Sequence, residues 1–91
     1  MEKNKGVEKA VALRYDKNRA MAPQVVAGGH GAVAEKIVEI AREAGVYIME
    51  DPDLVEILAH VPVGDEIPEE LYQAVAEVLA FVYKVNGSYR E

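Results

Sequence analysis

A glycine-rich stretch, GGHG, is the part of the chain that most resembles a ligand-binding loop. Gly29, Gly31 and Ala34 spell G-x-G-x-x-A between an expected strand and an expected helix. An acidic pair, Glu50 and Asp51, follows the next expected strand. In the dinucleotide-binding fingerprint such glycines let a pyrophosphate approach a helix N-terminus, and an acidic residue about 20 positions later binds the ribose. A dinucleotide site normally spans a larger sheet, so the other interpretation is a tight turn that starts a helix close to a sheet. Both stay open at this point.

The other residues with reactive side chains do not combine into an active site. Neither His30 nor His60 has a second histidine at metal-ligand spacing, so we expect no metal site. The chain has no Cys and no Thr, and its one serine, Ser88, lies in the expected tail, so there is no credible nucleophile. Three glutamates share one helical face and most simply form a solvated surface: Glu35, Glu39 and Glu43. We expect no catalytic residue and no cofactor.

The composition indicates a small cytoplasmic domain that does not bind nucleic acid. Of 91 residues, 51% are apolar, which is enough for one compact core. The formal charge of −6 opposes binding to a phosphate backbone. The chain has no disulfide framework, no apolar core of a signal peptide, and no apolar run near the roughly 20 residues that span a bilayer. We expect a cytoplasmic monomer without direct membrane insertion.

The hydrophobic pattern predicts two strands, a helix and a third strand. The first strand is expected at 10–15, in AVALRY, and the second at 24–27, in QVVA. A helix follows at 32–44, and Gly45 stands where a terminating glycine is expected. The apolar run VYIM at 46–49 predicts a buried strand parallel to the second one. Nothing ahead of the first strand is long or apolar enough to pair with it.

The remainder of the chain is expected to be helical. Pro52 opens a short helix with Asp51 as its N-cap. The last helix is expected to run from Pro68 to a glycine stop at Gly87. It carries two apolar stripes side by side, one of Leu71, Val75, Val78, Val82 and Val85, the other of Tyr72, Ala76, Leu79 and Tyr83. Either the fold covers both stripes, or part of the second stays exposed as a docking surface.

These elements predict an α/β fold in which helices pack on a small mixed sheet of about three strands, in the order β-β-α-β-α-α. Residues 1–8 are expected to form a flexible charged leader, 9–87 a single domain, and 88–91 a tail.

Several stretches of the sequence resemble the cytoplasmic C-terminal domain of the FlhB family of flagellar export-switch proteins and its type III secretion relatives. They are AVALRYD, the AP, VVA and G that follow it, AREAGVYIMEDP and IPEELYQAVAEVLAFVYK. The resemblance covers nearly the whole chain, from residue 10 to residue 87. It implies a non-catalytic binding module of the flagellar type III export apparatus and a sheet that lacks the family's first strand.

The family's own reaction is not expected here. In the family, the strand that matches AVALRY follows an Asn-Pro-Thr-His motif, and the chain cleaves itself between Asn and Pro. In this chain Lys5, Gly6, Val7 and Glu8 stand ahead of the strand, and no asparagine precedes a proline. The chain therefore resembles the fragment on the C-terminal side of that cleavage. The missing partner strand would then belong to another molecule.

The resemblance also implies which residues bind partners. The family's substrate-docking patch corresponds to Ala22, Pro23, Ala76 and Leu79. The free edge offered to a partner strand corresponds to Ala10, Val11, Ala12, Leu13, Arg14 and Tyr15. The implied partners are export substrates of the rod and hook type and export-apparatus membrane proteins, including a full-length or truncated FlhB, at the inner membrane. The alternative function is a small nucleotide-binding or regulatory domain that uses the GGHG turn.

Overall fold

The computed structural model describes residues 8–16 and 22–90, and only the backbone at residues 83 and 85–90. Residues 1–7 of the expected leader and Glu91 of the expected tail lie outside the described residues. The side chains of Tyr83 and Val85, which end the two expected stripes, also lie outside them.

Two antiparallel strands, β1 (Lys9–Arg14) and β2 (Gln24–His30), form the sheet. Both expected strands are confirmed, although β2 continues through GGH instead of ending at Ala27. The pairing shifts by one residue between Ala12 and Leu13, so that Val26 is the extra residue of a β-bulge.

The expected third strand at 46–49 is wrong, because these residues belong to no strand and the sheet within residues 8–16 and 22–90 has two strands. The loop before the last helix takes the place beside β2 instead. Val25 donates to the carbonyl of Asp65 at 2.9 Å and accepts from the N–H of Gly64 at 2.7 Å, and Gln24 forms an antiparallel bridge with Glu66. This loop occupies the edge of β2 where a parallel strand would have to bond. The α/β class is confirmed, but the expected βαβ unit is wrong.

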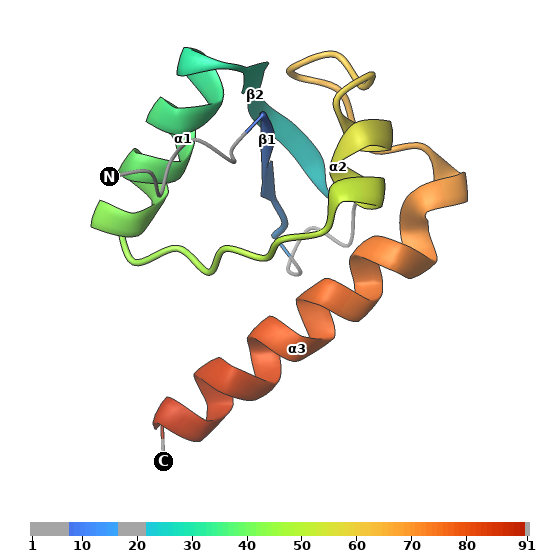
Figure 1. Ribbon diagram of the computed structural model, residues 1–91. Helices are drawn as coiled ribbons and strands as arrows, with labels where there is room; N and C mark the ends of the chain where they lie inside the picture. The colour runs from blue at the N-terminus through green and yellow to red at the C-terminus, as the bar shows by residue number, and fades with distance from the viewer. Residues whose placement is uncertain (1–7, 17–21, 91) are drawn as a thin grey trace.

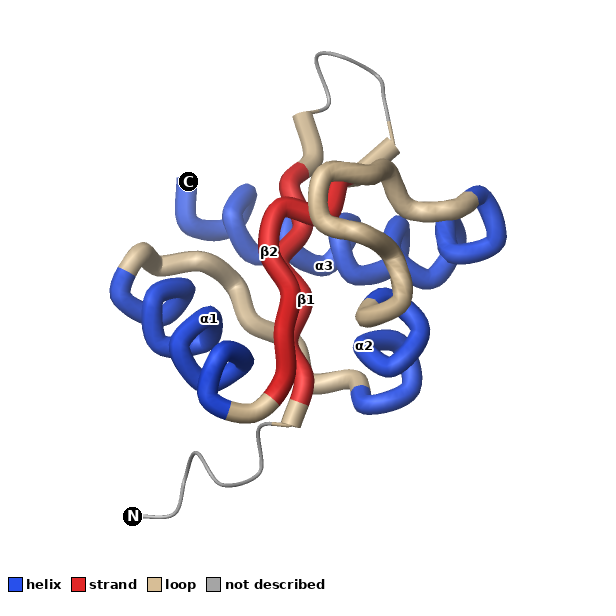
Figure 2. Tube along the Cα trace, turned by 90° about the horizontal axis from the view of Figure 1, so that it is seen from above, coloured by secondary structure: helices blue, strands red, loops and turns tan. Residues whose placement is uncertain are grey.

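Helices lie on both sides of the strands (Figures 1 and 2). Helix α1 (Ala32–Glu43) lies on one side and α2 (Pro52–Leu58) on the other. A short 3-10 turn, η2 (Glu69–Leu71), leads into α3 (Tyr72–Arg90), which starts on the α2 side and extends away from the sheet.

The expected helix signals at α1 and α2 are confirmed. The carboxylate of Asp51 accepts from the N–H of Leu54 at 3.1 Å, with Pro52 in the first turn, as expected of an N-cap. Gly45 follows α1 with a φ of 75°, the left-handed conformation that ends a helix with least strain in glycine.

Small side chains let α1 approach the sheet closely. Ala34 of α1 is fully buried, and Ala10 of β1 is only 9% exposed. A Cβ at Gly29 would lie only 2.3 Å from Cγ1 of Val33, so packing requires a glycine there. The tight approach of a helix to a sheet, which was one of the two interpretations of GGHG, is therefore present at Gly29.

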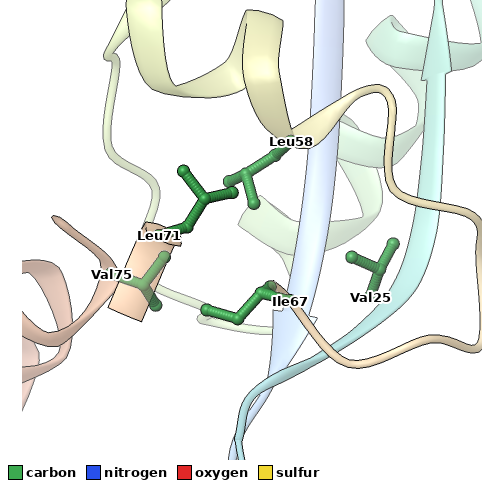
Figure 3. Packing of buried hydrophobic residues seen from close by; sticks show 5 residues of the cluster. All are labelled: Val25, Leu58, Ile67, Leu71 and Val75. Carbon is green, nitrogen blue, oxygen red and sulfur yellow. The ribbon is translucent and has the colours of Figure 1, made fainter. Parts of the chain in front are cut away.

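The apolar core lies on the α2 side of the sheet. Five buried side chains, each from a different segment, form it, namely Val25, Leu58, Ile67, Leu71 and Val75 (Figure 3). Val11 and Leu13 of β1 pack against this cluster from the alternate positions of the strand. Burying such side chains stabilises the fold by about 1.5–3 kcal/mol each.

Helix α3 is covered on only part of its surface. Leu71 and Val75 of the first stripe are buried, whereas Tyr72 and Ala76 of the second stripe are exposed. The helix continues through Gly87 to Arg90, so the expected glycine stop is wrong. A glycine in a helix interior costs about 1 kcal/mol relative to alanine, which does not by itself end a helix.

Helix α3 also contacts the segment between α1 and α2. The ring centroid of Phe81 lies 5.6 Å from that of Tyr47 in this segment.

Candidate functional site

Two of the four expected docking residues lie at the border of the core. Ala22, just before β2, and Leu79, in the middle of α3, both pack against the buried cluster and both keep part of their surface exposed. They stand 57 positions apart in the sequence (79 − 22), and each borders the cluster that includes Val75.

The other two docking residues differ in exposure. Pro23 is buried, and its carbonyl accepts from the N–H of Ile67 at 2.9 Å, so its role is to hold the loop against β2. Ala76 is exposed and lies three positions before Leu79, about 60° away around the helix. The solvent-facing part of the expected patch is therefore formed by α3.

A shallow depression runs along α3 beside Ala76. It is lined by Tyr72, Gln73, Ala76, Glu77 and Ala80. Tyr72 is 46% exposed, so its ring lies largely in solvent at the edge of this depression. In this depression the apolar side chains of the second stripe lie next to the amide of Gln73 and the carboxylate of Glu77. A shallow surface of this mixed character fits a polypeptide better than a small molecule.

The expected edge strand, β1, has one partner strand in the part of the chain that the structure describes. The N–H of Gly31 donates to the carbonyl of Glu8 at 3.0 Å, which makes these two a hydrogen-bonded pair. Hydrogen-bonded and non-bonded pairs alternate along an antiparallel ladder. The backbone groups of Lys9, Val11 and Leu13 therefore point away from β2.

The residues of this edge face different surroundings. Ala10 is buried, and Val11, Ala12, Leu13 and Tyr15 are half-buried, whereas Arg14 is exposed. Tyr15 lies one residue beyond the end of β1. An incoming strand would therefore meet mainly apolar side chains, with Arg14 at its end.

The GGHG residues do not form a phosphate-binding turn between parallel strands. Gly28, Gly29 and His30 lie inside β2, and Gly31 alone connects β2 to α1, with a φ of 61°. Glu50 and Asp51 follow an irregular segment rather than a parallel strand. The geometry that the dinucleotide fingerprint requires is therefore missing among the described residues.

A groove of about 460 Å³ lies between β2 and the C-terminal end of α2. Gly28, His30, Leu58, His60 and the segment 61–63 are among the residues that line it, together with Lys9 and Glu56. Sequence reasoning placed Glu56 near His60 on the same helix but did not connect the two histidines to each other or to Lys9. No local pattern could have done so, because Lys9 and Glu56 are 47 positions apart.

The ion pair at this groove joins β1 to α2. Nζ of Lys9 lies 2.9 Å from Oε1 of Glu56. The hydrogen bond from Lys9 and the positive charge of Lys9 hold the pKa of Glu56 below its ordinary value. Both side chains keep contact with water, so the ion pair contributes little to the stability of the fold.

The described residues hold neither a membrane-spanning helix nor a metal-binding cluster. None of the helices within them combines the length and the hydrophobicity of a membrane span. Within residues 8–16 and 22–90, no three His, Asp or Glu side chains come together in a way that could hold a metal ion.

Comparison with known proteins gives one consistent family. The model of the FlhB HrpN YscU SpaS Family matches residues 7–82. YlqH of Bacillus subtilis (strain 168) is 48% identical over 88 residues, which are 97% of this chain and 95% of YlqH. The flagellar biosynthetic protein FlhB of Escherichia coli (strain K12) is 49% identical over 78 residues, which are 85% of this chain. The chain spans only 20% of the length of that FlhB.

Solved structures give the same result. The cytoplasmic domain of FlhB from Shewanella putrefaciens superposes with a TM-score of 0.78 at 45% identity, over 82% of this chain and 61% of that one. The C-terminal domain of PscU superposes with a TM-score of 0.78 at 30% identity, over 82% of this chain and 96% of that one.

Proposed function

The chain belongs to the FlhB HrpN YscU SpaS Family, and we propose that it is a non-catalytic binding module of the flagellar type III export apparatus, which docks export substrates or the membrane-bound switch protein. In this proposal the module works in the cytoplasm, next to the export gate at the inner membrane. Its partners are rod- and hook-type export substrates and a full-length or truncated FlhB.

The observation that carries the proposal is the incompletely covered α3. Val75 and Leu79 pack the helix against the core, while Ala76 and Tyr72 leave an apolar surface in solvent. Burial of such a surface by a partner is favourable by about 25 cal/mol per Å² of apolar area. The absence of an Asn-Pro bond from the sequence supports a role in binding rather than in self-cleavage.

The second surface of the proposed module is the edge of β1. Its outward backbone groups, at Lys9, Val11 and Leu13, can bond a strand supplied by another molecule. A partner that contains the sheet strand found ahead of the cleavage motif in full-length relatives would bind here. The two surfaces then serve two partners, a membrane protein at β1 and a substrate at α3.

The substitution Ala76→Asp tests the docking patch. A charge there is tolerated in water but costly once a partner desolvates it, so the affinity for the N-terminal segment of a rod or hook subunit should fall about tenfold or more. Affinity is measured by calorimetry and the melting temperature by circular dichroism. We expect the melting temperature to fall by only a few degrees, since an exposed Ala-to-Asp change in a helix costs about 0.7 kcal/mol.

Ala74→Asp is the matched control, because residue 74 is exposed on the same helix but lies on the opposite side from residue 76. It should keep the wild-type affinity. If Ala76→Asp folds normally and binds as tightly as Ala74→Asp, the patch is not the docking site. If Ala76→Asp melts far below Ala74→Asp, the second stripe belongs to the core and the assignment of the patch is wrong.

A further inference from the structure

The groove between β2 and the end of α2 contains a glycine that neither backbone conformation nor packing explains. Gly28 is not among the glycines with positive φ, and a Cβ added to it would meet its nearest atoms, the carbonyl of Ala10 and Cγ2 of Val11, at ordinary distances of 3.8 and 3.9 Å. Gly29, in contrast, is required by packing against Val33. A glycine inside a strand weakens it, and where no bulge needs it, it often marks a place where a ligand or another backbone comes close.

The bulge of this sheet does not account for Gly28. The extra residue is Val26, between the pairs Ala12↔Ala27 and Leu13↔Val25, whereas Gly28 pairs regularly with Val11. At position 28 the sheet therefore has no side chain over Val11, and this leaves room in the floor of the groove.

The edge of β2 beside the groove is unpaired. The loop that follows α2 bonds to Pro23, just before β2, and to Val25 of β2, and then diverges at Gly64, whose φ is 101°. Pro62 has no N–H with which to continue the ladder. In the described part of the chain, no backbone hydrogen bond joins residues 26–30 to a segment other than β1.

The alternation of the ladder places the backbone groups of Gly28 and His30 on this open edge. Gly31 pairs with Glu8 through a hydrogen bond, so Gly29 faces β1 and its two neighbours face outward. An outward N–H and C=O on an extended backbone are satisfied by another extended backbone. The occupant that fits this edge is a polypeptide strand.

The rim of the groove favours a carboxylate on that strand. Lys9 gives one of its three donors to Glu56, which leaves two, and no hydrogen bond engages the imidazole of His30 or of His60 among the described residues. Lys9 and His30 are directly paired across the strands, on the same side of the sheet as Gly28. Glu56 is the one carboxylate that lines the groove, and Lys9 binds it.

We propose that this groove is a second peptide-binding site, distinct from the docking patch on α3, which takes an extended segment with an apolar residue over Gly28 and an acidic residue two positions away, next to Lys9, His30 and His60. The backbone of the segment bonds to the open edge of β2. Its apolar side chain enters the space that Gly28 leaves between the sheet and Leu58. The proposal is independent of the role of α3 in export.

The probe is a capped pentapeptide, acetyl-Thr-Leu-Thr-Glu-Thr-amide, in which Leu and Glu share one face of an extended chain. It is titrated into the ¹⁵N-labelled full chain and followed by NMR. We expect saturable shifts of the amide signals of Gly28, His30 and His60. The same peptide with Lys in place of Glu should bind about tenfold more weakly, since one charge-assisted hydrogen bond is lost.

Two substitutions of Gly28 separate binding from folding. Gly28→Val favours the strand and fills the groove, so it should abolish the peptide shifts while the unfolding midpoint stays at or above that of the wild type. Gly28→Ala adds only a Cβ at tolerated distances and should bind more weakly than the wild type but measurably.

Three results would overturn the proposal. One is wild-type affinity in a folded Gly28→Val. Another is equal affinity for the Glu and Lys peptides. The third is that inorganic phosphate, at the same concentration as the peptide, shifts the amide signals of the same residues. The groove would then be a general anion site.

Discussion

The contact between Lys9 and Glu56 has a consequence for the pH dependence of stability. The pKa of Glu56 is lower in the folded chain than its ordinary value of 4.5, because Lys9 bonds and attracts the ionised form. A depressed carboxyl pKa contributes stability above the unfolded-state pKa, and this contribution is lost as the pH falls through the folded-state pKa. We expect Lys9→Gln to raise the pKa of Glu56 toward 4.5.

A ¹³C NMR titration of the Glu56 carboxyl in both proteins measures this change. Urea unfolding at pH 7 and at acid pH should show that Lys9→Gln loses less of its stability on acidification than the wild type. Identical titration curves for Glu56 in the two proteins would contradict the assignment of the shift to Lys9.

At the scale of single residues, the sequence predicted those features that depend on near neighbours. Asp51 as an N-cap and Gly45 as a helix end were found because each acts on a backbone group a few positions away. The groove was missed because Gly28 and His60 meet only through the fold. The docking residues came from the family resemblance, and the structure adds that Pro23 is buried while Ala76 is exposed.

At the scale of elements, the strand at 46–49 shows where a local pattern fails. A short run of apolar and β-branched residues is compatible with a strand, but a strand also needs a neighbour, and a pattern cannot supply one. At β2 the loop at 64–67 pairs with the edge at Gln24 and Val25, and the segment 46–49 does not pair beside it. Tyr47 instead contacts Phe81, and Val46 and Met49 are exposed.

Hydrogen exchange tests the assignment of the open edge of β1. The amides of Val11 and Leu13 point away from β2 and should exchange faster than those of Ala10 and Ala12, which bond across the hairpin. A peptide with the sequence of the strand that precedes the cleavage motif in a full-length relative should slow the fast set. The exchange is read by NMR, residue by residue, with a scrambled peptide as control. Unchanged rates at saturating peptide would remove β1 as a partner site.

At the scale of the whole molecule, the chain matches almost all of YlqH but a fifth of a full-length FlhB. The superposition with the cytoplasmic domain of FlhB from Shewanella putrefaciens covers 82% of this chain. Because no Asn-Pro bond exists in the sequence, the purified chain should stay one species during long incubation at mildly alkaline pH. Mass spectrometry checks this, with a self-cleaving FlhB cytoplasmic domain as the positive control. Two defined fragments in place of the intact mass would contradict the prediction.

The contact between Tyr47 and Phe81 gives the molecule a built-in spectroscopic reporter. Phe81 is the only phenylalanine and the chain has no tryptophan, so its ring protons give the one phenylalanine spin system among the signals of five tyrosines and two histidines. The ring current of Tyr47, 5.6 Å away, displaces those signals as long as α3 lies against the segment between α1 and α2. A ligand that lifts α3 would return the resonances of Phe81 to their free positions. A ligand that only settles on the surface of α3 would leave them displaced, so one unlabelled proton spectrum distinguishes the two modes of binding.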